Sequence, residues 1–173
     1  MADTPQSLTL KDNRDATEVY ELASRRTFFA FVTIALLVGL LNVFGQSPTG
    51  SRVDAPTARL EVSAPLDVRG GIYFQGRFRI TAHEDIESAT LVLESGWLES
   101  MHINTIEPAP VGESSRDGDL ALDFGHVAAG DTIAAFLQFQ VNPNNVGQRS
   151  QDVRLYDGEE LLAVAERTVT IWP

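Results

Sequence analysis

The feature that most constrains the fold of this chain is a run of nineteen residues without charge, 27–45, which reads TFFAFVTIALLVGLLNVFG. An α-helix rises about 1.5 Å per residue, so this run nearly spans the hydrocarbon core of a bilayer, which is about 30 Å thick. Its apolar residues fall on every side of such a helix, whereas a helix in a soluble core normally keeps a polar face. The run therefore predicts a transmembrane helix over residues 27–45.

The charges beside the run predict its orientation. Two arginines directly precede it, whereas the first basic residue after it is Arg52. Basic residues accumulate on the cytoplasmic side of a membrane helix. Residues 1–26 are therefore expected as a cytoplasmic tail, in which 17–22 extend the helix. We expect a cell-membrane protein that crosses the lipid bilayer once, with its C-terminal domain extracytoplasmic. The residues expected to anchor it are Arg25, Arg26, Phe28, Phe29, Leu36, Leu37, Leu40 and Leu41.

Residues 24–29, SRRTFF, resemble the twin-arginine export signal, whose pattern is Ser/Thr-Arg-Arg-x-Phe followed by an apolar residue. The matching positions are Ser24, Arg25, Arg26, Phe28 and Phe29. The usual lysine is replaced by Ala30. A cleaved signal has an apolar core of about 7–15 residues and then a small-x-small site. This run is longer, and its best candidate site, 43–45, is poor, so a retained anchor is favoured over cleavage. Both interpretations place the remaining chain outside the cytoplasm.

Beyond the run the sequence changes character. Residues 46–57 are rich in proline, glycine, serine and threonine and predict a linker. Apolar and polar residues then alternate, which is typical of strands with one buried face. Strands are predicted at 58–64, 72–82, 89–95, 97–106, 120–127, 132–141, 152–157 and 161–172. We expect an all-β domain over 58–173, an immunoglobulin-like antiparallel β-sandwich of seven to eight strands, preceded by one transmembrane α-helix.

Two local signals refine this prediction. Asp157-Gly158 joins two predicted strands and predicts a two-residue hairpin, in which glycine supplies the positive φ. Within 72–82 the apolar residues share one parity, and Gly76 interrupts them. A glycine inside a strand marks either a bulge or a close approach of neighbouring atoms.

The segments VRGGIYFQGRFRITAHEDIESATLVLES and LALDFGHVAAGDTIAAFLQFQV resemble the immunoglobulin-like repeats of bacterial envelope proteins, the CARDB/DUF11-like group. The similarity covers about residues 58–141. It rests on Gly71, on 89–93, and on Gly125, Val127, Gly130, Asp131 and Thr132. The resemblance implies the sandwich fold and implies no ligand. The chain departs from the pattern at ITAHED, where those repeats often carry an asparagine. No lysine follows Lys11, so the Lys–Asn bond of some such domains cannot form.

The search for catalytic chemistry gives no site. The chain has no cysteine, and its three histidines are not at metal-ligand spacing. Neither a serine-nucleophile elbow nor a phosphate loop is present. Asp117, Asp119 and Asp123 predict a hairpin turn before they predict a calcium site. We therefore expect no enzyme, no cofactor and no metal. The formal net charge of -11 argues against nucleic acid as a partner and against a domain lying flat on anionic lipid.

The expected function is binding. Residues 104–119 predict a long loop, and long loops are often recognition surfaces. Trp97 is expected in the core, and Trp172 either caps the sheet or faces a partner. The expected partner surface comprises Asn104, Glu107, Pro108, Pro110 and Trp172. We expect a membrane-anchored accessory domain, such as a small subunit of a membrane complex, that contacts another membrane or envelope protein. The alternative is a secreted or surface adhesion or assembly module, released after signal cleavage.

Overall fold

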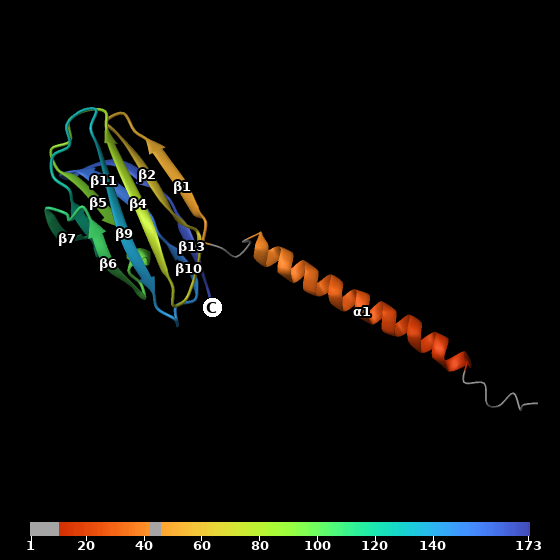
Figure 1. The fold of residues 1–173 in the computed structure, drawn as a ribbon. Coiled ribbons are helices and arrows are strands. Elements are labelled where there is room, and N and C mark those ends of the chain that lie inside the picture. Colours follow the sequence, from red (N-terminus) through yellow and green to blue (C-terminus); the bar gives the residue numbers. More distant parts are fainter. Residues whose placement is uncertain (1–10, 42–45) are drawn as a thin grey trace, which may run out of the picture. The chain divides into compact units, whose positions relative to one another are not determined.

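The computed structural model describes the backbone of residues 11–41 and 46–173, with side chains from residue 20 onward (Figure 1). The chain divides into two units. The N-terminal unit contains the single described α-helix, and the C-terminal unit, which begins at Gly45, contains all the described strands. Each unit is considered separately below.

Helix α1 spans Lys11–Leu40, so it begins sixteen residues before the predicted membrane segment and includes the predicted extension at 17–22. Its segment Tyr20–Leu40 has a mean hydropathy of 1.5 and is long enough to cross a membrane. None of that apolar window is buried in the structure, and Phe28, Phe29 and Leu37 are at least half exposed. Residues 42–45, which end the predicted span and contain the candidate cleavage site, lie outside the described residues.

The C-terminal unit is a β-sandwich. In spatial order, the first sheet contains β1 (Pro48–Asp54), β2 (Ala58–Pro65), β4 (Tyr73–Ala82), β9 (Thr132–Val141) and β6 (Met101–Glu107). The second sheet contains β12 (Glu160–Ala165), β11 (Val153–Asp157), β5 (Ala89–Leu93), β8 (Asp119–Asp123) and β7 (Gly112–Arg116). A third, small sheet contains β10 (Gly147–Ser150), β13 (Thr168–Trp172) and β3 (Asp67–Arg69). Figure 1 shows the first sheet lying across the second.

The predicted fold class is confirmed: the domain is all-β, and its strand pairs are antiparallel except for β13 with β3. Residues 46–173 contain thirteen strands, more than the seven to eight expected. Part of the difference arises because 161–172, predicted as one strand, breaks at Glu166–Arg167 into β12 and β13. The short strands β1, β3, β7 and β10 were not predicted, because none of them carries a clear apolar alternation.

The core forms where the two sheets face each other, and Trp97 lies at its centre. Trp97 belongs to the short 3-10 helix η2 (Ser95–Trp97) and is fully buried. Its ring centroid lies 5.3 Å from that of Phe78 and 5.1 Å from that of Phe139. Its indole Nε1 donates a hydrogen bond of 2.9 Å to the carbonyl oxygen of Gln151, so the polar edge of the ring is satisfied. The prediction that Trp97 is a core residue is confirmed.

Gly76 marks a close approach and not a bulge. The register between β4 and β9 runs without a shift past this position. A Cβ atom on Gly76 would lie 2.9 Å from the Phe78 ring and 3.2 Å from the Phe139 ring. The missing side chain therefore gives these two core rings the space they occupy.

Both predicted Asp-Gly turns lie at two-residue hairpins, but Asp157 ends β11 and pairs with Glu160, so the loop of that hairpin is Gly158-Glu159. Gly158, with φ 54°, begins the loop that joins β11 to β12. Asp117 and Gly118, with φ 55° and 90°, form the loop that joins β7 to β8. Two successive positive φ values are the requirement of a type I′ turn, which matches the twist of the flanking strands.

The expected linker, 46–57, is largely strand, and this prediction requires correction. β1 pairs with β2 along its whole length, from Pro48 opposite Pro65 to Asp54 opposite Arg59. Few of its side chains face the core, so the pairing rests on the backbone and on one buried cation, Arg167. The Arg167 guanidinium donates hydrogen bonds to carbonyl oxygens of both β1 and β2.

Candidate functional site

The candidate site is a hollow of about 380 Å³ between the edge of the first sheet and the edge of the second. We call it the edge groove. The chain passes from β6 to β7 here, through residues 108–111, and so connects the two sheets along this side. The edge groove is lined by Ile103, Asn104, Thr105, Ile106, Ala109, Pro110, Glu113 and Leu120.

The floor of the edge groove is apolar because the core reaches the surface there. Ile103, Ile106 and Leu120 are only partly buried and pack against the hydrophobic core. Val111, beside the groove, is 74% exposed. Covering such apolar side chains with another molecule removes them from water, which stabilises the complex by about 25 cal/mol per Å² of apolar surface buried.

The walls of the edge groove are strand edges. Among the described strands, β6 pairs only with β9, and β7 pairs only with β8. The outer edge of each strand therefore presents backbone N–H and C=O groups that a further extended chain can bond. The register of β6 shifts between Ile103 and Thr105, so Asn104 is the extra residue of a bulge. Such a bulge bends the edge and re-aims the neighbouring side chains.

The charges that flank the edge groove are acidic. Glu107 ends β6 and Glu113 lies in β7, and both are exposed. Neither glutamate takes part in an ion pair among the residues whose side chains are described. A chain that entered the groove would meet two carboxylates and an apolar floor, an arrangement that favours a basic and apolar segment.

The structure brings together four of the five residues predicted as a partner surface. Asn104 and Pro110 line the edge groove, and Glu107 and Pro108 form the connection between them, through a cis peptide bond. Trp172 lies apart, at the end of β13 in the third sheet. It is 51% exposed, and its Nε1 donates a hydrogen bond of 3.1 Å to Oδ1 of Asp67.

The prediction of a long loop over residues 104–119 is wrong for most of that range. Residues 112–116 form β7, which pairs with β8, and only 108–111 connect β6 to it. The apolar floor of the groove was missed altogether. A signal for it exists in HINTI, residues 102–106, where the apolar residues lie three positions apart and break the alternation of a flat strand.

Two of the three aspartates singled out in the sequence, Asp119 and Asp123, have structural partners. Asp119 accepts a hydrogen bond of 2.8 Å from the Ser95 backbone N–H and pairs with Arg154 at 2.9 Å. Asp123 accepts from the Gly125 N–H at 2.8 Å. Within the residues whose side chains are described, no three His, Asp or Glu side chains are placed so that they could hold a metal ion.

Two solved structures have a similar arrangement, and both are distant. One is a structure of AvmM, described by the words "AvmM Catalyzes Macrocyclization in Alchivemycin A Biosynthesis"; it is 6% identical, covers 73% of this chain and 89% of that chain, and has a TM-score of 0.46. The other is a non-cellulosomal cohesin from the hyperthermophilic archaeon Archaeoglobus fulgidus; it is 14% identical, covers 73% and 92%, and has a TM-score of 0.39. Neither similarity bears on what this chain does.

No model of a known protein family matches the chain, and no curated protein matches it. The β-sandwich part of the predicted resemblance is confirmed by the fold itself. The narrower resemblance to CARDB/DUF11-like repeats, and that of residues 24–29 to a twin-arginine signal, stay predictions.

Proposed function

We propose that this protein is a single-pass membrane protein whose β-sandwich lies outside the cytoplasm and binds another membrane or envelope protein. It acts as an accessory subunit and not as an enzyme. Helix α1 supports the anchor, because its segment Tyr20–Leu40 is long and apolar enough to cross a bilayer and its apolar window is not buried in the structure. Arg25 and Arg26, at the start of the uncharged run, support a cytoplasmic N-terminus.

The observation that carries the binding role is the edge groove. Its apolar floor of Ile103, Ile106 and Leu120 lies between two strand edges that have no further strand beside them among the described residues. An extended segment that adds to such an edge gains backbone hydrogen bonds, and its alternate side chains enter the hollow. The partner segment is therefore extended, with apolar side chains on one face and basic side chains opposite Glu107 and Glu113.

A site-specific crosslink in intact membranes tests this proposal. A photoreactive amino acid replaces Thr105 or Ala109 in the groove, and Gln148 on the separate edge strand β10 serves as the matched control. We expect an adduct of one defined mass from both groove positions and none from the control. The Glu113→Lys variant should weaken that adduct, whereas Glu87→Lys, an exposed glutamate away from the groove, should not. An adduct that forms equally at position 148, or the absence of an adduct at both groove positions, contradicts the proposal.

The alternative of a released module is favoured by one observation, the SRRTFF motif at 24–29. N-terminal sequencing of the mature protein separates the two functions. An N-terminus before residue 27 supports the anchored protein, and one near residue 46 supports release.

A further inference from the structure

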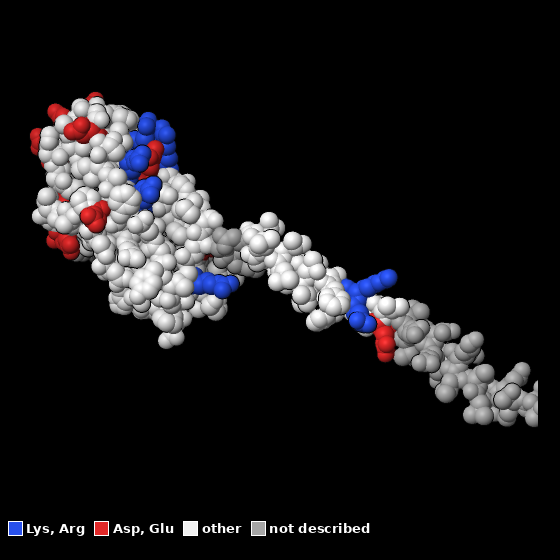
Figure 2. Space-filling model, in the orientation of Figure 1, with Lys and Arg blue, Asp and Glu red and all other residues white. Residues whose placement is uncertain are grey.

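The domain is strongly acidic, yet one face of it is basic. Residues 46–173 contain nine arginines and nineteen carboxylates. Four of these arginines lie together on the outer face of the first sheet, over β1, β2 and β4: Arg52, Arg59, Arg77 and Arg79. We call this the arginine face. Figure 2 shows the basic side chains gathered over these strands.

Strand register explains why these side chains lie together. Arg52 of β1 is opposite Glu61 of β2, and Glu61 is opposite Arg79 of β4. The next row places Asp54 opposite Arg59. Residues directly opposite each other in a sheet point to the same face, so the alternation of three strands puts all four arginines on one surface.

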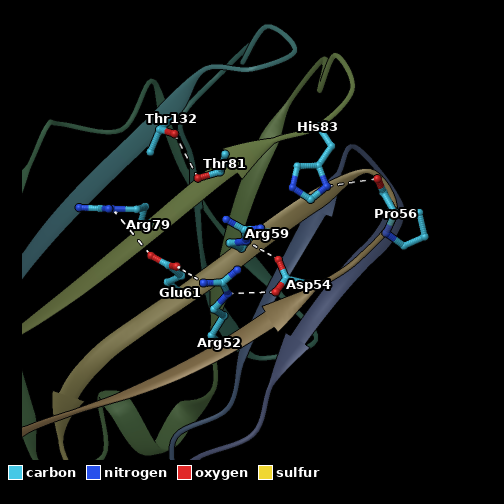
Figure 3. A network of polar contacts seen from close by, with 9 residues as sticks. All are labelled: Arg52, Asp54, Pro56, Arg59, Glu61, Arg79, Thr81, His83 and Thr132. Atoms are coloured by element: carbon cyan, nitrogen blue, oxygen red, sulfur yellow. Dashed lines mark hydrogen bonds and ion pairs between the residues drawn. The ribbon is translucent and has the colours of Figure 1, made fainter.

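The two carboxylates on this face hold three of the arginine side chains in place but do not cancel the positive charge of the face. Asp54 accepts hydrogen bonds from both Arg52 and Arg59, and Glu61 lies 3.6 Å from Arg52 and 3.9 Å from Arg79 (Figure 3). The hydrogen bonds from Arg59 and Arg52 hold the pKa of Asp54 below its usual range, so this carboxylate is ionised at neutral pH. The face still carries four arginines against two carboxylates.

Arg77 completes the arginine face without a carboxylate partner among the described ion pairs. Its guanidinium lies over the Phe136 ring, 5.1 Å from the centroid, and the residue is exposed. A guanidinium held against an aromatic ring keeps its N–H donors directed to solvent, where they can bond an anion in pairs. Beyond Phe136 the next charge in this row is Glu107 of β6, which lies on the same face of the sheet at the margin of the arginine face, beside the edge groove.

We propose that the arginine face binds the anionic phospholipid headgroups of the membrane that holds helix α1. Phosphate oxygens match the paired N–H groups of arginine, and no lysine follows Lys11 in the chain. The face is the outer surface of a sheet, which suits a planar array of headgroups. Arg52 follows Leu41 by eleven positions, so the length of the chain keeps Arg52 within about 40 Å of Leu41 in any arrangement of the two units.

The expectation from net charge, that the domain avoids anionic lipid, therefore holds for most of its surface and not for this face. The rest of the domain carries five arginines against seventeen carboxylates, so an anionic bilayer repels it. Charges on a protein surface act over about 8 Å at physiological salt. The bilayer consequently attracts the arginine face only when that face is turned toward it, and the two effects together select one orientation.

This inference rests on the proposed membrane anchoring, and its test separates the two. The chain contains no cysteine, so one introduced thiol is the only one present. Ala134→Cys places it on the arginine face, in the row of Arg79, and Ser114→Cys places the control thiol in β7 of the other sheet. The full-length protein is inserted into nanodiscs of phosphatidylcholine, with or without phosphatidylglycerol, and the rate of maleimide labelling is measured.

We expect the thiol at position 134 to react about tenfold more slowly when phosphatidylglycerol is present, since each basic residue near an anionic surface adds attraction. The thiol at position 114 should be unaffected, and high salt should abolish the protection. Arg77→Gln with Arg79→Gln should also abolish it, whereas Arg69→Gln, which removes an exposed arginine of β3, should not.

Equal labelling of position 134 in both kinds of disc overturns the proposal while the anchoring stands. The same labelling is measured in native membranes. Protection that appears there, but not in discs that contain no other membrane protein, also overturns the proposal and assigns the arginine face to an acidic protein. Failure of the protein to enter discs of either composition overturns the anchoring, and with it this inference.

Discussion

Arg167 is the residue whose replacement should reveal most about how the domain is held together. It is only 4% exposed and lies in the bend between β12 and β13. Its guanidinium donates to the carbonyl oxygens of Thr49 at 3.1 Å, Val62 at 3.3 Å and Ala64 at 2.6 Å, and to the hydroxyl of Ser51 at 2.9 Å. Burial lowers the pKa of this guanidinium, but arginine stays charged at physiological pH. None of these acceptors is a carboxylate, so neutral polar groups alone solvate the buried charge.

The expected loss of stability on replacing Arg167 follows from these four hydrogen bonds. Each is expected to contribute about 1 kcal/mol to the free energy of unfolding, and more where the donor is charged. Removing a buried charge also removes its desolvation penalty, which offsets part of the loss. We therefore expect Arg167→Met to lower the free energy of unfolding by about 2–4 kcal/mol, out of a total of roughly 5–15 kcal/mol for a domain of this kind. Ser51→Ala, which removes one acceptor, should cost about 1 kcal/mol.

Denaturant unfolding of the full-length protein in detergent measures the total loss, and amide hydrogen exchange shows where it falls. Arg167 bonds both partners of the β1–β2 pair, and β1 has little apolar burial of its own. Exchange should therefore rise first at the amides of β1, before any change in β4 or β9. An Arg167→Met protein with unchanged stability, or one that loses protection uniformly across the sandwich, would refute this account of how β1 is held.

Three further changes test other parts of the structure. Gly76→Ala places a methyl group 2.9 Å from the Phe78 ring and should destabilise the domain by about 1–3 kcal/mol in denaturant unfolding; wild-type stability would show that the rings move freely. Arg59→Gln should raise the pKa of Asp54 toward its usual range, seen by carboxyl carbon NMR. Because the folded state lowers this pKa, the stability that the Asp54 carboxylate adds is present at neutral pH and is lost as pH falls through the lowered value, and the variant should show a smaller loss. Leu37→Arg adds about 2.5–3.5 kcal/mol to membrane insertion, so this variant should be extracted by carbonate; retention in the pellet would contradict the anchor.

The long strands could be predicted from the sequence because each has a buried face. In β4 the residues alternate between exposed and buried from Tyr73 to Ile80, as the parity of the apolar residues predicts. β2 and β9 follow the same rule over nearly all of their length. Burial of every second side chain leaves a period of two in the sequence, and that period is visible without any knowledge of the partner strand.

The short strands could not be predicted, for a physical reason that β1 illustrates. Its sequence, PTGSRVD, has the composition of a linker. Its partner strand supplies backbone groups along its whole length, and Arg167, more than a hundred residues away, supplies the hydrogen bonds that bind it from the other side. Neither contribution leaves a local pattern. β7 is a similar case, since its five exposed or half-exposed residues pair through the backbone alone.

The sequence located only part of the edge groove. Asn104, Glu107, Pro108 and Pro110 were predicted as a partner surface because proline-rich, polar stretches between strands indicate an irregular connection, and the connection does lie there. Trp172 was grouped with them on residue type alone. Only the sheet order shows that β13 belongs to a different sheet from β6 and β7.

The two sides of the sandwich differ in a way that bears on what the edge groove can bind. On one side β12 packs against β1 and β2, and Arg167 closes the gap between the sheets. On the other side β6 and β7 leave their outer edges free among the described strands, and such edges tend to pair with copies of themselves. Glu107 and Glu113 lie at these edges, so a second copy would place like charges opposite each other, which is unfavourable. The same two carboxylates would attract a basic strand, so the charge that we propose selects a partner also disfavours pairing with a second copy of the chain.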